Sequence, residues 1–340
     1  MNDVLLTVSG KIDADIAEQI EKGLRPLADY IAMSEAFGAD LMDYNRAIET
    51  AGFMGRLIHK IAGNNALLAW TCFRARKNYR LIFTDGEQVG IPLALLLKFF
   101  GGRQRPQHFM IVHILSVGKK MRFFDWFAIQ SAIDLFFVYA TRQKEFIQER
   151  WQVAPARVIL TPFMVDDDFF QAENAAGTIT RADLSLSESP IICSVGLEFR
   201  DYPTLLKAVE GLDVQVVVAA GSPWSKRADS TEDQKIPENV VVRRFTQFEL
   251  RDVYALSEFV VMPLYNVAFQ AGVTAILEGM AMKKAIVCSR TPGQTDIIID
   301  QVNGLYVPSE EAAALREAIQ FLLANPDEAK RMGENRPFSY

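Results

Sequence analysis

The sequence has 340 residues, of which 50% are hydrophobic and 23% charged, and its net charge is −6. This composition excludes an intrinsically disordered chain, and the length allows two domains. Cys72, Cys193 and Cys288 lack metal-ligand spacing, which favours a reducing compartment over a disulfide framework. The first residues do not resemble a signal peptide, and the apolar runs are too short to span a bilayer, so we expect a cytoplasmic protein.

The charge is unevenly distributed along the chain. Residues 1–160 carry 20 Lys and Arg against 16 Asp and Glu, whereas residues 161–340 carry 16 against 26. Residues 50–122 are the most basic part, with Asp85 and Glu87 as their only acids. Such a basic, aromatic-rich region predicts peripheral contact with anionic lipid at the inner membrane face, or with a phosphorylated acceptor. Solvated helix faces are the simpler alternative, and nucleic acid is not expected because no nucleic-acid motif accompanies the charge.

Short apolar strands alternate with helices in the first half of the chain. Strands are predicted at Val4–Val8, Tyr30–Met33, Leu81–Thr84, Phe109–Ile114, Leu135–Ala140 and Arg157–Leu160. Helices are predicted over Ile12–Lys22, over Leu41–Lys77 with a break at Asn64-Asn65, and over Ile91–Phe100. This alternation predicts an α/β domain with a parallel sheet and helices on both faces.

A polar segment without a sustained period, residues 166–189, is predicted to link an amino-terminal domain, 1–165, to a carboxy-terminal domain, 190–340. The alternation then restarts. Strands are predicted at Ile191–Val195, Val214–Ala220, Val240–Val242, Phe259–Met262 and Lys284–Ser289, and helices over Tyr202–Val209, Phe248–Ala255, Ala275–Met282 and Glu311–Leu323. We therefore expect a second doubly wound domain.

Ligands of doubly wound sheets bind at the carboxyl ends of strands. In the second half, the small residues Gly272, Val273 and Thr274 open an apolar helix, where backbone amides and the helix dipole favour phosphate. Arg200 follows Gly196 shortly after another strand, where a guanidinium can pair with a diphosphate. On position alone, a surface arginine is an equal alternative.

Glu278 is a lone carboxylate in the apolar helix, where its burial is costly without a partner. A capping box would need Ser or Thr three residues earlier, and Ala275 stands there. A ligand hydroxyl, such as that of a ribose, or an internal partner would satisfy Glu278. In the first half, His113 ends a strand, which suits either a structural hydrogen bond or a functional group. No Walker A motif, dinucleotide-binding glycine motif or metal-ligand cluster is present, so no metal and no cofactor are expected.

Together these residues resemble the retaining, nucleotide-sugar-dependent glycosyltransferases of family 4. The resemblance covers most of the chain from about Leu81 and is strongest over residues 190–335. It is carried by Ser194–Leu205, by Tyr254-Ala255 to Pro263, by Gly279–Ala281, by Asn303-Gly304 and by Thr161–Asp166. The paired-Glu hallmark of the family corresponds to Gln270 and Glu278, with seven residues between them.

The resemblance implies a GT-B fold, in which two Rossmann-like domains face each other across a cleft. It also implies a metal-independent hexosyltransferase that uses a nucleotide-sugar substrate and a glycan or lipid-linked acceptor. Arg200 would stabilise the leaving diphosphate, His113 and Gln270 would face the donor sugar, and Glu278 would bind ribose. Gly196, Gly272, Val273 and Thr274 would contact the donor, and Asp85 and Glu87 would lie on the acceptor side.

Four features depart from the family pattern. Gln270 replaces the first Glu, Leu197 replaces the usual Arg, and Ser9-Gly10 replaces the Gly-Gly loop of the first strand. Family members also usually continue beyond the position of Tyr340 into a helix that returns to the amino-terminal domain. These departures leave two alternatives open: a catalytically weak nucleotide-sugar-binding or regulatory protein, and a nucleotide-sugar epimerase on the same fold.

Overall fold

The computed structural model describes residues 3–220 and 235–335, and the chain divides into two compact units. Unit 1 comprises residues 1–18 and 27–162, and unit 2 comprises residues 19–26 and 163–340. The segment predicted as a linker contributes Phe169, Phe170, Ile179 and Leu184 to the buried core of unit 2. It therefore packs as part of unit 2 as well as joining the two units in sequence.

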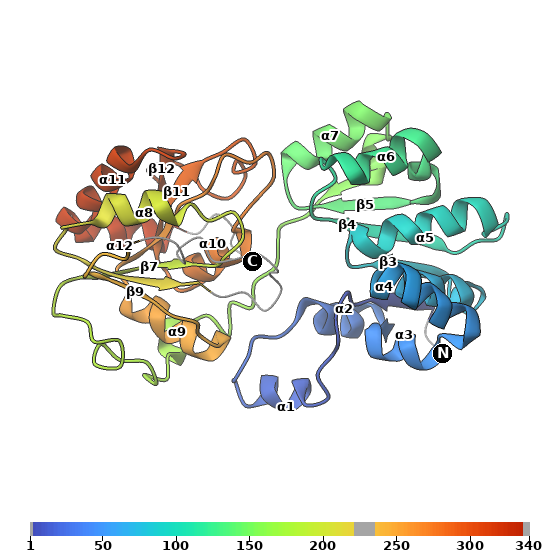
Figure 1. Ribbon diagram of the computed structural model, residues 1–340, viewed down its shortest axis with the longest axis horizontal. Helices are drawn as coiled ribbons and strands as arrows, with labels where there is room; N and C mark the ends of the chain where they lie inside the picture. Colours follow the sequence, from blue (N-terminus) through green and yellow to red (C-terminus); the bar gives the residue numbers. More distant parts are fainter. Residues whose placement is uncertain (1–2, 221–234, 336–340) are drawn as a thin grey trace. The chain divides into compact units, whose positions relative to one another are not determined.

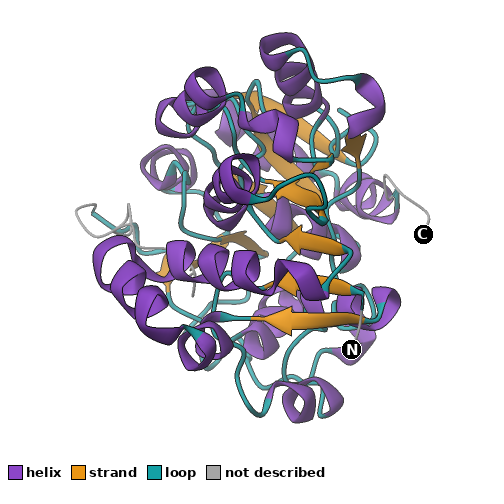
Figure 2. Ribbon diagram, turned by 90° about the vertical axis from the view of Figure 1, so that its right-hand side faces the viewer, coloured by secondary structure: helices purple, strands orange, loops and turns teal. Residues whose placement is uncertain are grey.

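Unit 1 contains a parallel six-stranded sheet in the order β2-β1-β3-β4-β5-β6, of which Figure 1 labels the neighbouring strands β3, β4 and β5. The strands are β1 (Val4–Thr7), β2 (Ala39–Met42), β3 (Leu81–Thr84), β4 (Gln107–Val112), β5 (Leu135–Val138) and β6 (Val158–Leu160). Its helices are α2 (Asp29–Phe37), α3 (Tyr44–Thr50), α4 (Gly52–Ala75), α5 (Glu87–Phe100), α6 (Gly118–Phe127) and α7 (Thr141–Trp151), and the short helix α1 (Ile16–Glu21) begins in unit 1 and ends in unit 2. Figure 2 shows helices, in purple, on both sides of these orange strands.

The predicted strand at Tyr30–Met33 is wrong, because these residues lie in α2. Ala, Met and Glu in this stretch favour a helix, and Gly38 ends it in the left-handed conformation with φ +57°. The strand follows directly as β2, which pairs with β1. Within α4 the helix is interrupted at Gly63, with φ +79°, one residue before the predicted break.

Unit 2 contains a second parallel six-stranded sheet, in the order β12-β11-β10-β7-β8-β9. Its strands are β7 (Ile191–Val195), β8 (Gln215–Ala219), β9 (Val240–Val242), β10 (Phe259–Met262), β11 (Ala285–Arg290) and β12 (Gly304–Pro308). Its helices are α8 (Tyr202–Val209), α9 (Gln247–Leu256), α10 (Val273–Ala281), α11 (Ala312–Ala324) and α12 (Pro326–Glu334). The polar helix α12 was not predicted from the sequence.

Alternate residues of the strands in unit 2 enter different cores. Val260 and Met262 of β10 pack in the cluster that includes α9 and α10, whereas Phe259 and Val261 pack with α8, α11 and α12. Successive side chains of a strand point to opposite faces, so helices cover both faces of this sheet. The structure thus confirms the predicted doubly wound α/β architecture in each unit. No helix within the described ranges is long and apolar enough to cross a membrane.

Candidate functional site

The loops at the carboxyl edge of the unit 2 sheet bring together the predicted residues around α10. Gly272 precedes α10 with φ +76°, a conformation that L side chains rarely adopt. A Cβ at Gly272 would lie 2.9 Å from the Met262 sulfur and 3.2 Å from Nη1 of Arg200. Glycine therefore permits both the turn and the close approach of Arg200. The first amides of α10, from Val273 and Thr274, lie at the positive end of the helix dipole.

Arg200 is buried and held in place by backbone carbonyls. Its Nε donates to the carbonyl of Val195 at 2.9 Å, and its Nη1 donates to that of Glu198 at 2.9 Å. Gly196 has φ +104°, and a Cβ there would overlap Nη2, so the guanidinium also packs against this glycine. Burial lowers the pKa of Arg200 from its ordinary value. A cation placed beside a helix N-terminus creates a strongly positive point that an anion such as a diphosphate can neutralise.

Glu278 lies in the second turn of α10 and has an internal partner. The hydroxyl of Tyr254, in α9, donates to Glu278 Oε2 at 2.9 Å and lies 3.3 Å from the Ala275 carbonyl. Burial raises the pKa of Glu278 to about 7, against the opposing effects of Tyr254 and Arg200. The sequence left two explanations open for the burial of Glu278, a ligand hydroxyl or an internal partner. The structure shows an internal partner, Tyr254. Tyr254 was missed as a site residue, although it belongs to the Tyr254-Ala255 motif.

Gln270 carries a buried amide whose Oε1 and Nε2 both lack a hydrogen-bond partner among the described residues. The Thr291 hydroxyl and Oε1 of Gln294 are likewise buried and unpaired there. Gln294 Nε2 donates to the Ala271 carbonyl, so the loops after β10 and β11 are joined at this point. A buried polar group without a partner costs about 1–3 kcal/mol. These groups indicate a place where a polar ligand can complete the hydrogen bonding.

In unit 1, Asp85 and Glu87 lie at the carboxyl end of β3 and hold neighbouring loops. Asp85 accepts hydrogen bonds from the Thr7 hydroxyl at 2.6 Å and from the Ser9 amide at 2.5 Å. Glu87 accepts from the Ile114 amide at 2.9 Å and pairs with Lys120 at 2.5 Å. Although burial opposes this effect, Lys120 and neighbouring donors lower the pKa of Glu87. Both carboxylates thus position the loops that follow β1 and β4.

His113 follows β4 and is oriented by these same residues. Its amide donates to Glu87 Oε2 at 3.1 Å, and its Nε2 lies 3.0 Å from the Asp85 carbonyl. Because a carbonyl oxygen only accepts hydrogen bonds, Nε2 carries a proton in this contact. The His113 side chain is exposed. Its hydrogen bonds join the predicted residues His113, Asp85 and Glu87 into one cluster at the carboxyl edge of the unit 1 sheet.

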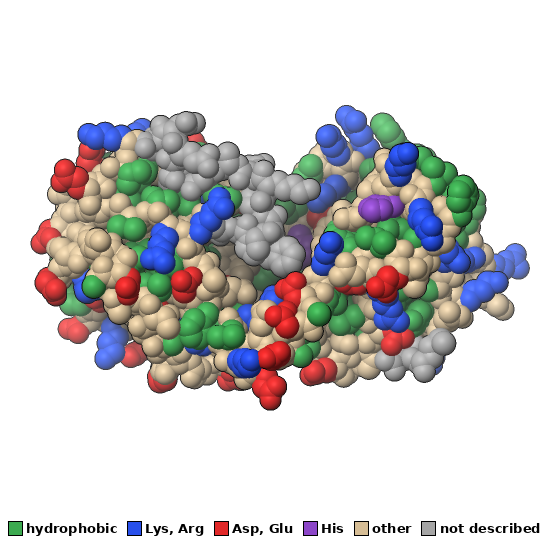
Figure 3. Space-filling model, turned by 60° about the horizontal axis from the view of Figure 1, so that its bottom comes forward, with side chains coloured by type: hydrophobic (Ala, Val, Ile, Leu, Met, Phe, Trp, Pro, Cys, Tyr) green, Lys and Arg blue, Asp and Glu red, His purple; other side chains and the backbone are tan. Residues whose placement is uncertain are grey.

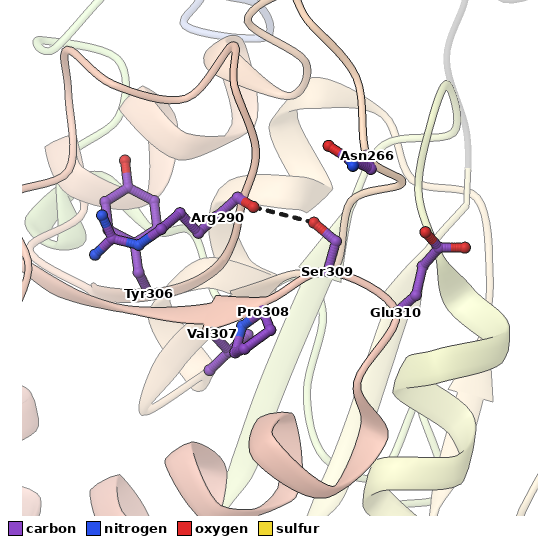
Figure 4. Close-up of a pocket in the computed structure, with 7 residues that line it drawn as sticks. All are labelled: Asn266, Arg290, Tyr306, Val307, Pro308, Ser309 and Glu310. Carbon is purple, nitrogen blue, oxygen red and sulfur yellow. Dashed lines mark hydrogen bonds between the residues drawn. The ribbon is translucent and has the colours of Figure 1, made fainter.

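A further hollow of about 380 Å³ opens at the carboxyl ends of β11 and β12 (Figure 4). Arg290 lies over the ring of Tyr306, with 4.3 Å from its guanidinium carbon to the ring centroid. The Tyr306 hydroxyl donates to the Gln294 carbonyl at 2.9 Å, which connects this hollow with the loop beside Gln270. The sequence did not single out Tyr306 to Glu310, because their only shared signal is their position at the end of β12.

Comparison with solved structures defines the class of fold. The chain is similar to sucrose-phosphate synthase from Thermosynechococcus elongatus, with a TM-score of 0.69 at 18% identity, over 98% of this chain and 93% of that one. It is also similar to HepE from Anabaena, solved in complex with UDP-glucose, with a TM-score of 0.67 at 12% identity, over 98% and 92% of the two chains. Two parallel six-stranded sheets with flanking helices match this GT-B class, which confirms the predicted fold.

Residues 179–337 match the family model "Glycosyl transferases group 1". In sequence the chain is 25% identical over 207 residues to alpha-D-kanosaminyltransferase of Streptomyces kanamyceticus, which covers 57% of this chain and 52% of that protein. It is 29% identical over 139 residues to O-antigen chain mannosyltransferase C of Escherichia coli, covering 40% and 37%. The match thus spans about half of the first relative and less of the second. The similarity to the group 1 glycosyltransferases therefore lies in residues 179–337, which include most of unit 2.

Proposed function

We propose that this chain is a glycosyltransferase that transfers a hexose-type sugar from a nucleotide diphosphate donor, with retention and without a metal. The observation that carries the proposal is the convergence of Arg200 and the glycine-opened N-terminus of α10 on one point. A diphosphate leaving group develops negative charge as the sugar departs, and fixed positive groups stabilise that charge. HepE, solved with UDP-glucose and with UDP and glucose, and the family match support a nucleotide-sugar donor.

Each predicted site residue has a role in this proposal. Arg200 and the amides of Gly272, Val273 and Thr274 bind the diphosphate, with Gly196 giving Arg200 its space. Glu278 accepts hydrogen bonds from ribose hydroxyls while Tyr254 keeps it oriented.

Gln270 offers its unpaired amide to the donor sugar, and His113 acts on the same sugar, as the family resemblance implies. Asp85 and Glu87 are proposed for the acceptor side, where their contacts suit a positioning role. The proposed acceptor is a glycan or a lipid-linked glycan, with peripheral membrane contact through residues 50–122.

The test is the release of nucleoside diphosphate from a panel of nucleotide sugars by the purified full chain. We expect turnover that is reduced by at least about a hundredfold in Arg200→Met, because one strong contact to developing charge is lost. Arg251→Met is the matched control: Arg251 is similarly buried, and it packs against Phe169 and Phe248 outside the site. Loss of turnover in both variants, or in neither, would contradict the assignment of Arg200.

The binding-protein alternative is favoured by one specific observation, the neutral amide of Gln270 at the position of a family carboxylate. A binding protein would be stabilised against heat by a nucleotide sugar without releasing a nucleoside diphosphate, with or without acceptor. Arg200→Met would then abolish the stabilisation. An epimerase would instead convert the donor to a different nucleotide sugar, which chromatography of the same reactions detects.

A further inference from the structure

A basic hollow of about 930 Å³ lies at the amino edge of the unit 1 sheet. Its lining comes from the start of β3, the start of β4 and the segments that follow α4 and α5. Its cations are Arg76, Lys77, Arg80, Arg103 and Arg105, and no acidic residue belongs to the lining. The proposed acceptor-side residues of unit 1 lie at the opposite, carboxyl edge of the same sheet. The two surfaces are therefore separated by the length of the strands, roughly 13–20 Å at about 3.3 Å per residue.

Two nearby carboxylates neutralise part of this charge. Arg105 pairs with Asp134 through two contacts, at 2.7 and 3.1 Å, and this pair is partly buried. Arg80 lies 3.6 Å from Asp3, with both side chains largely exposed, so this pair is weak. Lys77 and Arg103 form no ion pair within the described ranges of the chain. Like charges gathered in one hollow repel each other, and an anionic partner removes that cost.

An aromatic rim adjoins the basic hollow where α5 ends. Phe99 and Phe100, 56% and 67% exposed, directly precede Gly101 and Gly102 of the hollow. Phe127, at the end of α6, contacts Phe99 edge to face with ring centroids 6.2 Å apart, and its neighbour Trp126 is 71% exposed. We call Phe99, Phe100, Trp126 and Phe127 the aromatic rim. The Lys98 ammonium donates to the Ala128 carbonyl at 2.8 Å and so holds the two helix ends together.

Exposed apolar side chains are ordinary when scattered, but four large exposed aromatics at two helix ends that Lys98 holds together, beside a group of cations, are not. The combination of aromatic rim and basic hollow suits the interface of a lipid bilayer. Aromatic rings insert at the headgroup boundary there, and Lys and Arg side chains attract anionic lipid. A soluble polyanion would use the cations and leave the rim in water. Single-stranded nucleic acid needs ring faces as stacking platforms, whereas Phe99 and Phe127 meet at 87°. Figure 3 shows blue Lys and Arg side chains lying among green hydrophobic ones on the surface of unit 1.

We propose that the basic hollow and the aromatic rim form a docking surface for an anionic phospholipid membrane. The proposal specifies the membrane contact included in the proposed function, but it does not require transferase activity, because docking is measured without a nucleotide sugar. It also places docking at the amino edge of the unit 1 sheet, away from His113, Asp85 and Glu87. Occupation of this surface by lipid therefore leaves the carboxyl edge of unit 1, where the His113 side chain is exposed, uncovered.

The test is co-sedimentation of the purified full chain with vesicles of phosphatidylcholine, with and without about 30% phosphatidylglycerol. We expect binding to the anionic vesicles that is weakened by about 0.5 M NaCl, and little binding to the neutral ones. Each lost cation should weaken binding about fivefold. A triple variant with Lys77→Gln, Arg80→Gln and Arg103→Gln should therefore bind anionic vesicles roughly a hundredfold more weakly. The matched control replaces Lys207, Lys235 and Lys330, which are exposed in unit 2, by Gln, and it keeps binding within about fivefold.

The aromatic rim is tested separately by Phe99→Ser with Phe100→Ser. These side chains are exposed, so the variant keeps its fold, as unchanged thermal unfolding verifies. We expect at least about tenfold weaker binding to anionic vesicles, because insertion of two phenyl rings is lost. Equal binding to neutral and anionic vesicles overturns the proposal, as does equal loss in the hollow and control variants. Binding to heparin through the hollow without binding to vesicles also overturns it and identifies a soluble polyanion as the partner.

Discussion

Burial of Glu278 makes the stability of the unliganded protein depend on pH in a direction opposite to that of most paired carboxylates. Its folded pKa of about 7 lies above the ordinary value of 4.5. The stabilisation is therefore fully present below pH 4.5 and is lost as the pH rises through 7, where the carboxylate must ionise in a buried site. At about 1.4 kcal/mol for each pH unit, this shift corresponds to roughly 3 kcal/mol.

Glu278→Gln removes the ionisation and keeps the shape of the side chain. In this variant Tyr254 can still donate to the oxygen of the new side-chain amide, so the contact between α9 and α10 survives. We expect the free energy of unfolding of the variant, relative to the parent protein, to rise by about 2–3 kcal/mol between roughly pH 5 and pH 8. Urea unfolding of the two full chains at both pH values measures this difference. A difference that stays constant between the two pH values refutes the reasoning.

Under the proposed function, ionisation of Glu278 should also be coupled to binding of the nucleotide-sugar donor. Ribose hydroxyls donate hydrogen bonds to the ionised carboxylate, so nucleotide binding favours the charged form and lowers its pKa. The affinity of the parent protein for a nucleotide sugar, whose diphosphate does not titrate near neutral pH, should therefore rise as the pH increases towards about 7, by up to about tenfold for each unit that the pKa falls. Calorimetric titration at several pH values measures this rise, and Glu278→Gln should abolish it. A slope that persists in the variant would assign the proton to another group.

Three further predictions concern neighbouring residues. Gly272→Ala should destabilise the protein by about 1–3 kcal/mol more than Gly211→Ala, because both glycines have φ above +70° but nothing lies within 4 Å of a Cβ at Gly211. Thermal unfolding of both variants tests this difference. Gln270→Glu should lower the thermal stability of the unliganded protein, since it buries a charge among unpaired groups. A nucleotide sugar should restore that stability, and a lack of recovery would exclude contact between residue 270 and the donor. Glu87→Gln should lower the free energy of unfolding by about 1–3 kcal/mol near pH 7 and by less below pH 4.5, because Lys120 keeps the pKa of Glu87 low. Urea unfolding measures both losses, and equal losses at the two pH values would contradict this prediction.

The doubly wound fold could be predicted because its signal is local. A run such as Phe259–Met262 is apolar at every position, as a strand covered on both faces requires, and all four residues are buried. Glu278 could be singled out for a related reason, since a carboxylate in an apolar helix is conspicuous in sequence. Local signals failed where a short apolar run was compatible with either a helix or a strand. Tyr30–Met33 was predicted as a strand but lies in α2, because so short a run does not distinguish the two.

Contacts between distant segments could not be predicted from the sequence. Tyr254 is 24 residues from Glu278, and nothing in either segment specifies that their side chains meet. The closeness of Arg200 to Gly272 likewise depends on β7 and β10 lying side by side in the sheet. The unpaired amide of Gln270 is a property of its surroundings, since the sequence shows the substitution but not whether a protein group satisfies it.

The two carboxyl edges differ in how far their polar groups are already satisfied. In unit 1, Asp85 and Glu87 receive hydrogen bonds from Thr7, Ser9 and Ile114, so a ligand gains little by contacting them. In unit 2, the Gln270 amide is buried without a partner within the described ranges, and binding a polar ligand there removes an existing cost. Under the proposed function, most of the donor affinity should therefore arise in unit 2, whereas the polar groups at the carboxyl edge of unit 1 are already held by hydrogen bonds within that unit.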